Sequence, residues 1–329
     1  MALHAVDSVS DAFGATREFL LPFEPRRWIK LAIVALFVGG GLSLPTVQFD
    51  VPGSVGRQPI EGGLPAFAPD TVPAAVGVLV AIAVLLGILY GLVGAIMEFV
   101  LVESLRSGDV SLRRYWQRRW RQGLRLFGFR LVIGAAALAV FVGWLGLFAA
   151  PMLFDGIEPI VPFVVLLAVG LPIVFLVGLL YALVASLTTV FVVPIMIRTD
   201  GGVLSGWRRL WRSIRSAPKQ YLAYVLIGFV LTIATGLLVS FAVGIAAIAL
   251  LIPVVVAGAL VHWTVSFSSA VGIVILAATG GLFFLSIAVL WLFLQVPVLA
   301  YLRYYALFVL GDIEHSFDLV SEQRNAVRG

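Results

Sequence analysis

The chain has 329 residues, of which 61% are hydrophobic and 12% are charged, and its formal net charge is +5. Its mean hydropathy of +1.10 excludes an ordinary soluble domain, because one core cannot bury that much apolar surface. The composition therefore predicts an integral membrane protein. Cysteine is absent, which excludes disulfides, thiolate catalysis and cysteine-ligated metal sites.

Apolar runs in chain order predict the membrane spans. The first run extends from Trp28 to Leu44, and a Pro/Gly-rich loop follows at 45–73. No basic segment with a cleavage site precedes it, so this first span is expected to be the targeting signal. The next three spans are expected at 72–102, 126–153 and 161–197. Proline is expected to bend or end the fourth at Pro162, Pro172 and Pro194.

The last two apolar runs each exceed one bilayer crossing. Residues 221–261 fit either one tilted helix with an extra segment or two short spans. The sequence leaves open whether 248–269 forms a separate span or a re-entrant segment. The final span is expected at 270–310. We predict an all-α polytopic helix bundle of six spans, with seven as the alternative.

Basic residues are segregated along the chain and predict its orientation. Arginines are concentrated in the connections at 103–130 and 198–219, whereas Arg57 is the only lysine or arginine in the opposite connections. Lys and Arg are retained on the cytoplasmic side of a membrane. We therefore expect both termini in the cytoplasm of a cell-membrane protein, which requires an even number of spans and favours six over seven.

Three helix entries resemble one another at nearly regular spacing, namely 30–34, 130–134 and 224–228. They predict one membrane domain built from two-span repeats related by a pseudo-threefold axis. The alternative is that the three segments resemble one another by chance, because all of them are apolar. The repeats are expected at 13–108, 109–201 and 202–314, with a short tail at 315–329. A Trp- and Arg-bearing joint recurs between them, at 98–130 and 194–224. Its third copy is expected to be split between 13–30 and 297–312.

These joints predict amphipathic helices that lie in the membrane interface. An apolar stripe recurs at four-residue steps as Leu112, Trp116, Trp120 and Leu124, with arginines on the remaining surface. Tryptophan favours the headgroup layer, and arginine binds phosphate with a bidentate fork. The expected surface for anionic lipid or a protein partner comprises Arg113, Arg114, Trp116, Arg118, Trp120, Arg121, Trp207, Arg208, Arg209, Trp211, Arg212 and Arg215. The alternative is that these are loops that only set topology.

Nucleic acid is disfavoured as a partner, because the membrane requires the tryptophan stripe. Small residues recur every fourth position and predict close helix packing; the alternative is flexible gating helices. The packing positions are Gly87, Gly91, Gly228, Gly236 and Gly244.

Charged residues at the cytoplasmic ends of the spans are expected to form buried pairs; they are Glu98, Glu103, Arg130 and Arg303. The interiors at 77–95, 134–150 and 225–260 carry no charge, which disfavours an ion or proton relay. The acidic tail, with Asp312, Glu314, Asp318 and Glu322, is expected to fold against the basic face. Motifs of catalysis are missing: the sequence has no multi-histidine site, no Gly-rich phosphate loop and no GxSxG. We predict no enzyme activity, no metal and no cofactor.

Two segments carry a family resemblance. The turn at 103–109, the Arg/Trp run after it and the closing segment 301–312 resemble an uncharacterised multi-pass membrane protein family of halophilic archaea. More distantly, the chain is similar to the six-span membrane domain found beside glycerophosphodiester phosphodiesterases. The resemblance implies a membrane architecture and supplies no catalytic residues, because the phosphodiesterase catalytic domain is missing.

Two functions follow from these observations. The first is a non-enzymatic membrane organiser or adaptor that binds anionic lipid or a partner through its basic inner face. The alternative is a transporter or flippase for a lipid-like substrate, which uses a groove between repeats. A closed bundle would favour the first, and a polar cavity at mid-depth the second. The sequence does not identify the physiological process, the partner or the oligomeric state.

Overall fold

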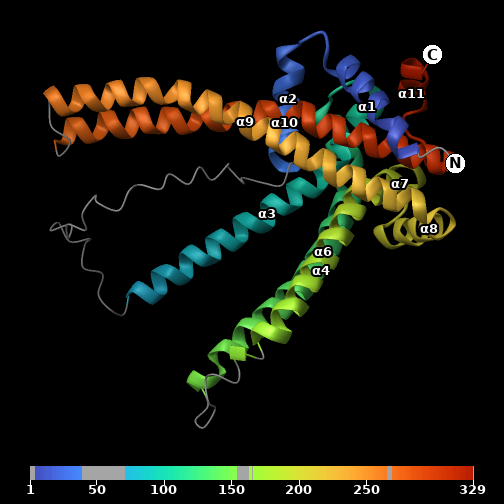
Figure 1. Cartoon of the computed structure of the whole chain (residues 1–329), viewed down its shortest axis with the longest axis horizontal. Coiled ribbons are helices and arrows are strands. Elements are labelled where there is room, and N and C mark those ends of the chain that lie inside the picture. Colours follow the sequence, from blue (N-terminus) through green and yellow to red (C-terminus); the bar gives the residue numbers. More distant parts are fainter. Residues whose placement is uncertain (1–3, 39–70, 154–162, 165, 265–268, 329) are drawn as a thin grey trace.

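In the computed structural model, the described residues are 4–38, 71–153, 163–164, 166–264 and 269–328, and their regular elements are helices throughout (Figure 1). The first half contains α1 (His4–Leu20), α2 (Pro25–Val38), α3 (Thr71–Ser107) and α4 (Leu112–Leu153). The second half contains η1 (Leu166–Gly170), α6 (Leu171–Leu187), η2 (Thr188–Val192), α7 (Val193–Thr199), α8 (Val203–Ser216), α9 (Pro218–Thr264), α10 (Ala270–Ile313), η3 (His315–Phe317) and α11 (Ser321–Arg328). The all-helical prediction is confirmed for these residues.

Among the described residues, five helical segments are long and apolar enough to cross a membrane; they lie within α3, α4, η1 to α7, α9 and α10. The predicted first span is not among them, because only its part up to Val38, within α2, is described. The rest of that predicted span lies outside the described residues. The reading of 221–261 as two short spans is wrong, since α9 is one helix that continues through Pro253 to Thr264.

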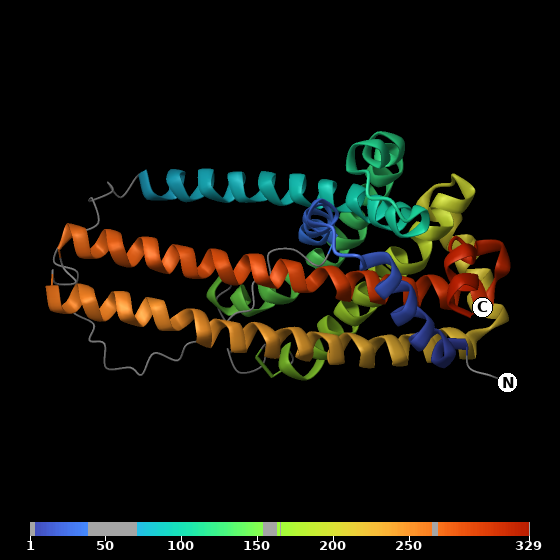
Figure 2. The ribbon, with the colours of Figure 1, turned by 90° about the horizontal axis from the view of Figure 1, so that it is seen from above.

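The helices meet at one end of the molecule and spread apart toward the other. We call the meeting region the hub: it comprises α1, α2, α7, α8, α11 and the adjoining ends of the long helices. Three arms leave the hub, namely α3, the α4–α6 pair and the α9–α10 pair (Figure 1). Both described ends of the chain lie at the hub (Figure 2). The arms do not close into one tight bundle.

The arms expose apolar side chains that a soluble protein would bury. In each of the five candidate spans, only 0% to 11% of the most apolar window is buried. Leu79, Phe175 and Phe241 are respectively 66%, 70% and 71% exposed. Because their backbone hydrogen bonds are satisfied within the helix, these surfaces are compatible with lipid. The arms therefore have the surface of membrane-spanning helices.

The hub has a protein-like core made from helix ends. Phe99 of α3, Phe191 of η2 and Phe308 of α10 are completely buried there. The two ends of the chain also meet, since the rings of Phe19 and Tyr304 pack edge to face at 6.0 Å. Burial of large aromatic side chains is strongly stabilising. The hub thus holds the larger of two hydrophobic cores; the smaller one, with Val243 and Trp291, joins α9 to α10 within their arm.

Special backbone positions separate the helices of the hub. Gly108, with φ 68°, turns the chain between α3 and α4, and Asp200, with φ 51°, ends α7 before α8. Proline disturbs the fourth predicted span at two of the expected places: π-helical turns precede Pro172 at the start of α6 and Pro194 at the start of α7. Pro162 lies outside the described residues.

The glycines expected to pack helices together mostly do not. A Cβ built at Gly91 would lie 3.3 Å from the Phe127 ring of α4, and one at Gly228 would lie 4.0 Å from Tyr305 of α10. The packing prediction is wrong within the described chain for the other three, because no atom lies within 4 Å of a Cβ built at Gly87, Gly236 or Gly244. These glycines lie on exposed faces of the arm helices; on α9 it is Val239 and Val243 that pack against α10 instead.

Gly123 is a close-packing position that the sequence did not single out, and it gives a testable prediction. A Cβ there would lie 2.9 Å from the Ile96 Cα, so Gly123→Ala must push α3 and α4 apart. We expect a loss of about 1 to 3 kcal/mol in the free energy of unfolding, seen as a lower melting temperature in detergent. Gly128→Ala, where a Cβ meets no atom within 4 Å, is the matched control. Equal melting temperatures for the two variants would contradict this prediction.

Candidate functional site

A buried ionic cluster ties the three arms together where they leave the hub. Glu98 of α3 forms ion pairs with Arg130 of α4, at 3.1 Å, and with Arg303 of α10. Arg303 Nη1 also donates to the Thr189 backbone oxygen at 2.7 Å, and Arg130 donates to the Thr189 hydroxyl. The Glu98 side chain is only 4% exposed. We call these four residues the arm cluster.

The arm cluster separates two cavities that open between the arms. One, of about 370 Å³, lies between α6, α9 and α10 and includes Arg303 in its lining. The other, of about 440 Å³, lies between α2, α3, α4 and α6 and includes Glu98 and Arg130. The Tyr305 hydroxyl, beside the first cavity, is buried without a hydrogen-bond partner in the described part of the chain.

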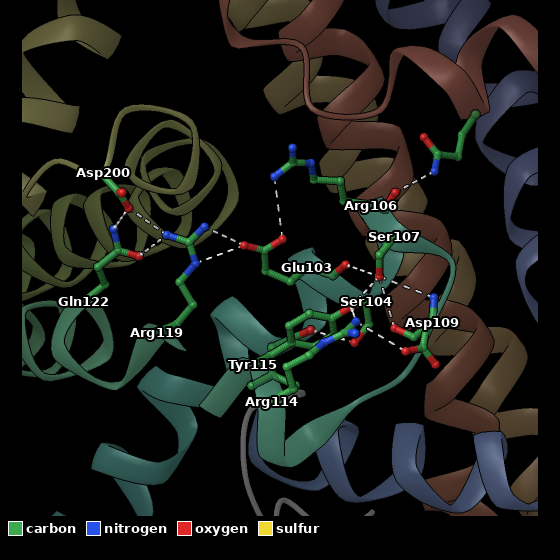
Figure 3. Close-up of polar contacts among 12 residues, drawn as sticks. Glu103, Ser104, Arg106, Ser107, Asp109, Arg114, Tyr115, Arg119, Gln122 and Asp200 are labelled. Atoms are coloured by element: carbon green, nitrogen blue, oxygen red, sulfur yellow. Dashed lines mark hydrogen bonds and ion pairs between the residues drawn. The ribbon is translucent and has the colours of Figure 1, made fainter. Parts of the chain in front are cut away.

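A second buried network holds the basic segments of the hub in place (Figure 3). The Arg119 guanidinium donates to Glu103 Oε1 from Nε at 2.9 Å and from Nη2 at 2.6 Å. Its Nη1 donates to Asp200 Oδ1 at 2.8 Å. Gln122 Nε2 donates to the same Asp200 oxygen at 3.1 Å. The network therefore joins the end of α3, the start of α4 and the turn before α8.

The structure brings together only part of the predicted charged group. Three of its members meet in the arm cluster, but Glu103 pairs with Arg119 and, at 3.7 Å, with Arg106. Glu103 lies more than one helical turn beyond Glu98, which places it deeper in the hub. Sequence reasoning missed Arg119, Gln122 and Asp200. Helical spacing could have indicated the first two, since Tyr115, Arg119, Gln122 and Leu126 share one face of α4.

The basic segment before the third span is not a separate interfacial helix. It is continuous with the span, because α4 runs unbroken from Leu112 to Leu153. The predicted apolar stripe is also divided. Leu112 and Trp116 pack on the hub core, whereas Trp120 and Leu124 are 45% and 48% exposed. The buried side of this segment carries Arg119 instead, because its charge is matched within the hub.

The helix α8 is separate and holds its partly buried tryptophan against the hub. Leu210 is completely buried, and Trp207 Nε1 donates to the Thr188 hydroxyl at 3.0 Å. Trp116 and Trp207 are thus anchors of the two basic segments rather than parts of an open surface. Trp211 is 50% exposed.

In each basic segment, an arginine lies beside the exposed tryptophan. The Arg121 guanidinium lies 5.5 Å from the Trp120 ring centroid, and that of Arg215 lies 5.3 Å from the Trp211 ring centroid. These distances permit cation–π attraction. We call the exposed side chains of these segments the basic surface; it comprises Arg113, Arg114, Arg118, Trp120, Arg121, Arg208, Arg209, Trp211, Arg212 and Arg215.

The acidic tail does not mainly neutralise the basic segments, contrary to expectation. Asp312 pairs with Arg324 at 3.2 Å and with Arg328 at 2.9 Å, and Asp318 pairs with Arg324 at 3.1 Å. Hydrogen bonding to Asp312, followed by that to Asp11, raises the pKa of Arg328 above its ordinary value. These tail carboxylates are therefore occupied by arginines of α11.

A family profile with the description "Family of unknown function (DUF7544)" matches residues 3–320. No curated protein and no solved structure matches the chain, so the resemblance to the phosphodiesterase membrane domain has no support. Within the described residues, no group of three histidines or acidic residues could hold a metal ion.

Proposed function

Because the chain belongs to the DUF7544 family, whose function is unknown, we propose a role from the structure: a non-enzymatic membrane organiser that binds anionic lipid headgroups at its basic surface. The observation that carries the proposal is the pairing of an exposed tryptophan with an arginine over its ring on both basic segments, at Trp120 with Arg121 and at Trp211 with Arg215. An aromatic ring that prefers the headgroup layer and a cation that binds phosphate then point outward together.

The buried contacts of the hub support this role, because they fix the basic surface in place. Arg119 joins α4 to the turn before α8, and Trp207 fastens α8 to η2. A preorganised surface loses less conformational freedom on binding than a flexible basic loop does. The alternative that these segments only set topology does not require such fixed contacts.

We also propose how the chain lies in the membrane. Six crossings with the hub in the cytoplasm would place the basic residues on the side where lysine and arginine are retained. The structure contains three adjacent helix pairs in chain order, α2–α3, α4–α6 and α9–α10. The helix α1 precedes the first pair, the basic start of α4 begins the second, and α8 precedes the third. This order supports the three proposed repeats at 13–108, 109–201 and 202–314.

Lipid retention tests the proposed role. The purified chain is extracted from nanodiscs of phosphatidylcholine with phosphatidylglycerol, and retained lipids are counted by native mass spectrometry. The double variant Arg208→Gln/Arg212→Gln removes two exposed positive charges. Each contributes about 1 kcal/mol of binding free energy near an anionic membrane surface, so we expect phosphatidylglycerol retention to fall by about tenfold. The matched control is Arg17→Gln/Arg26→Gln, which removes two exposed arginines outside α4 and α8.

Equal retention by the two double variants would show that general charge, rather than the basic surface, binds lipid. Unchanged retention together with a bound acidic protein would favour the partner-docking form of the organiser. The oligomeric state is read in the same spectra.

A transporter or flippase for a lipid-like molecule is the second candidate. The two cavities beside the arm cluster favour it, because each combines apolar side chains with charged ones. The charged residue is Arg303 in one cavity, and the charged residues are Glu98 and Arg130 in the other. Movement of headgroup-labelled lipid between leaflets, faster in proteoliposomes than in protein-free vesicles, would support this candidate. An unchanged rate would leave the organiser as the better account.

A further inference from the structure

A polar pocket lies where the tail folds back onto the hub. Its volume is about 570 Å³, and it is bounded by the end of α3, the start of α4, the end of α7 and residues 318–323. We call it the tail pocket. Four guanidinium groups line it, contributed by Arg106, Arg114, Arg118 and Arg198. Arg106 and Arg198 were not singled out as functional residues from the sequence.

Two hydroxyl groups add hydrogen-bonding capacity beside these cations. Ser107 Oγ and the Tyr115 hydroxyl lie 2.6 Å apart, and Arg114 Nη2 donates to the Tyr115 hydroxyl, also at 2.6 Å. Figure 3 shows Arg114, Tyr115 and Ser107 gathered at the turn between α3 and α4. Guanidinium and hydroxyl groups together provide the donors that phosphate oxygens accept.

Two of the four arginines of the pocket have acidic partners. Arg106 pairs at 3.7 Å with Glu103, which also pairs with Arg119 at 2.6 Å, and Arg114 pairs with Asp109 at 3.3 Å. Asp318 pairs with Arg324 at 3.1 Å. Glu322, the third acidic residue in the lining, is exposed. Within the part of the chain that the structure describes, no ion pair engages Arg118 or Arg198.

The tail forms a fixed wall of the pocket rather than a loose end. Gln323 Nε2 donates to the Arg106 backbone oxygen at 2.7 Å. Arg324 is buried and holds Asp312 and Asp318 together. Val320 is completely buried as well. A ligand in the tail pocket would therefore contact both the basic start of α4 and the C-terminal segment.

We propose that the tail pocket binds an anion through a phosphate group, presented either by a lipid headgroup or by a phosphorylated solute. A doubly charged phosphate matches the surplus of cations, and the surrounding hydroxyls can donate to its remaining oxygens. This site goes beyond the proposed basic surface, with which it shares Arg114 and Arg118, because Arg118 and Arg198 line one pocket together with the C-terminal tail.

Binding to the full-length protein tests the tail pocket. Inorganic phosphate is titrated by calorimetry, at constant ionic strength, into nanodiscs of phosphatidylcholine alone. Parallel samples contain phosphatidylcholine with phosphatidic acid, and hydrogen exchange is followed in residues 318–328. The variant is Arg118→Gln/Arg198→Gln, and the matched control is Arg17→Gln/Arg26→Gln, which removes two exposed arginines outside both the pocket and the basic surface.

We expect at least about tenfold weaker phosphate binding, or loss of the slower exchange caused by phosphatidic acid, in the pocket variant but not in the control. Saturation by inorganic phosphate in phosphatidylcholine nanodiscs identifies a solute source, whereas protection only with phosphatidic acid identifies a lipid source. The proposal would be overturned if the unaltered protein showed neither response, or if both variants lost the response equally. If Arg208→Gln/Arg212→Gln retained as much phosphatidylglycerol as the unaltered protein, that result would count against the basic surface but not against the tail pocket.

Discussion

Glu98→Gln is expected to destabilise the hub more than any other single substitution considered. The change preserves the shape of the side chain but removes the only carboxylate of the arm cluster, whose carboxylate oxygens face Arg130 and Arg303. Removing one partner of a buried ion pair costs about 3 to 5 kcal/mol, because the remaining charge stays buried and uncompensated. The melting temperature in detergent, followed by tryptophan fluorescence, measures this loss.

The control for Glu98→Gln is Glu18→Gln, the same chemical change at an exposed position on α1. It should leave the melting temperature unchanged. Because Glu98 joins α3 to α10, its loss should also speed hydrogen exchange where the arms leave the hub, at residues 95–100 and 300–306. Equal melting temperatures for the two glutamine variants would show that the arm cluster does not hold the arms.

Arg119→Lys is expected to have the second-largest effect, although it keeps the positive charge. The guanidinium reaches Glu103 through two nitrogens and Asp200 through a third. A lysine ammonium is a compact point charge on a flexible stem and cannot reproduce this planar fork. We expect a loss of about 2 kcal/mol in the free energy of unfolding, within the range for hydrogen bonds to charged groups, and faster hydrogen exchange at 198–206.

The neighbouring residue supplies the matched control for Arg119→Lys. Arg118 lies on the exposed side of α4, so Arg118→Lys should change neither the melting temperature nor the exchange at 198–206. Similar behaviour of both lysine variants would mean that charge alone, without the bidentate geometry, holds the turn before α8.

Composition and apolar periodicity were sufficient to predict helices and most of the long apolar segments, because these depend on local sequence. The start of α9 was expected at 221 and the end of α10 at 310, close to the observed Pro218 and Ile313. The first span was not confirmed, since α2 is described only to Val38. Local sequence also could not show that α4 continues through its basic segment without a break.

The candidate site was less predictable, because charge pairing depends on which helix ends meet. The sequence identified Glu98, Arg130 and Arg303 as groups that need partners within a membrane protein. It also predicted a buried pair for Glu103 but could not assign Arg119 as its partner, since Arg119 reads as one more exposed charge of the basic connection. The exposed glycines of the arms were misread for the same reason: a small-residue stripe does not reveal whether another helix reaches it.

The spreading of the arms has a consequence for the surrounding bilayer. The arms diverge from the hub (Figure 1), and large apolar side chains are exposed on all three of them. Water cannot cover such surfaces favourably, so in a membrane acyl chains must cover them. In a membrane the protein therefore occupies a wider area than its helices alone would, with lipid forming part of its effective cross-section. Changes in lateral pressure among those acyl chains would act on the angles between arms before they act on the core at their base.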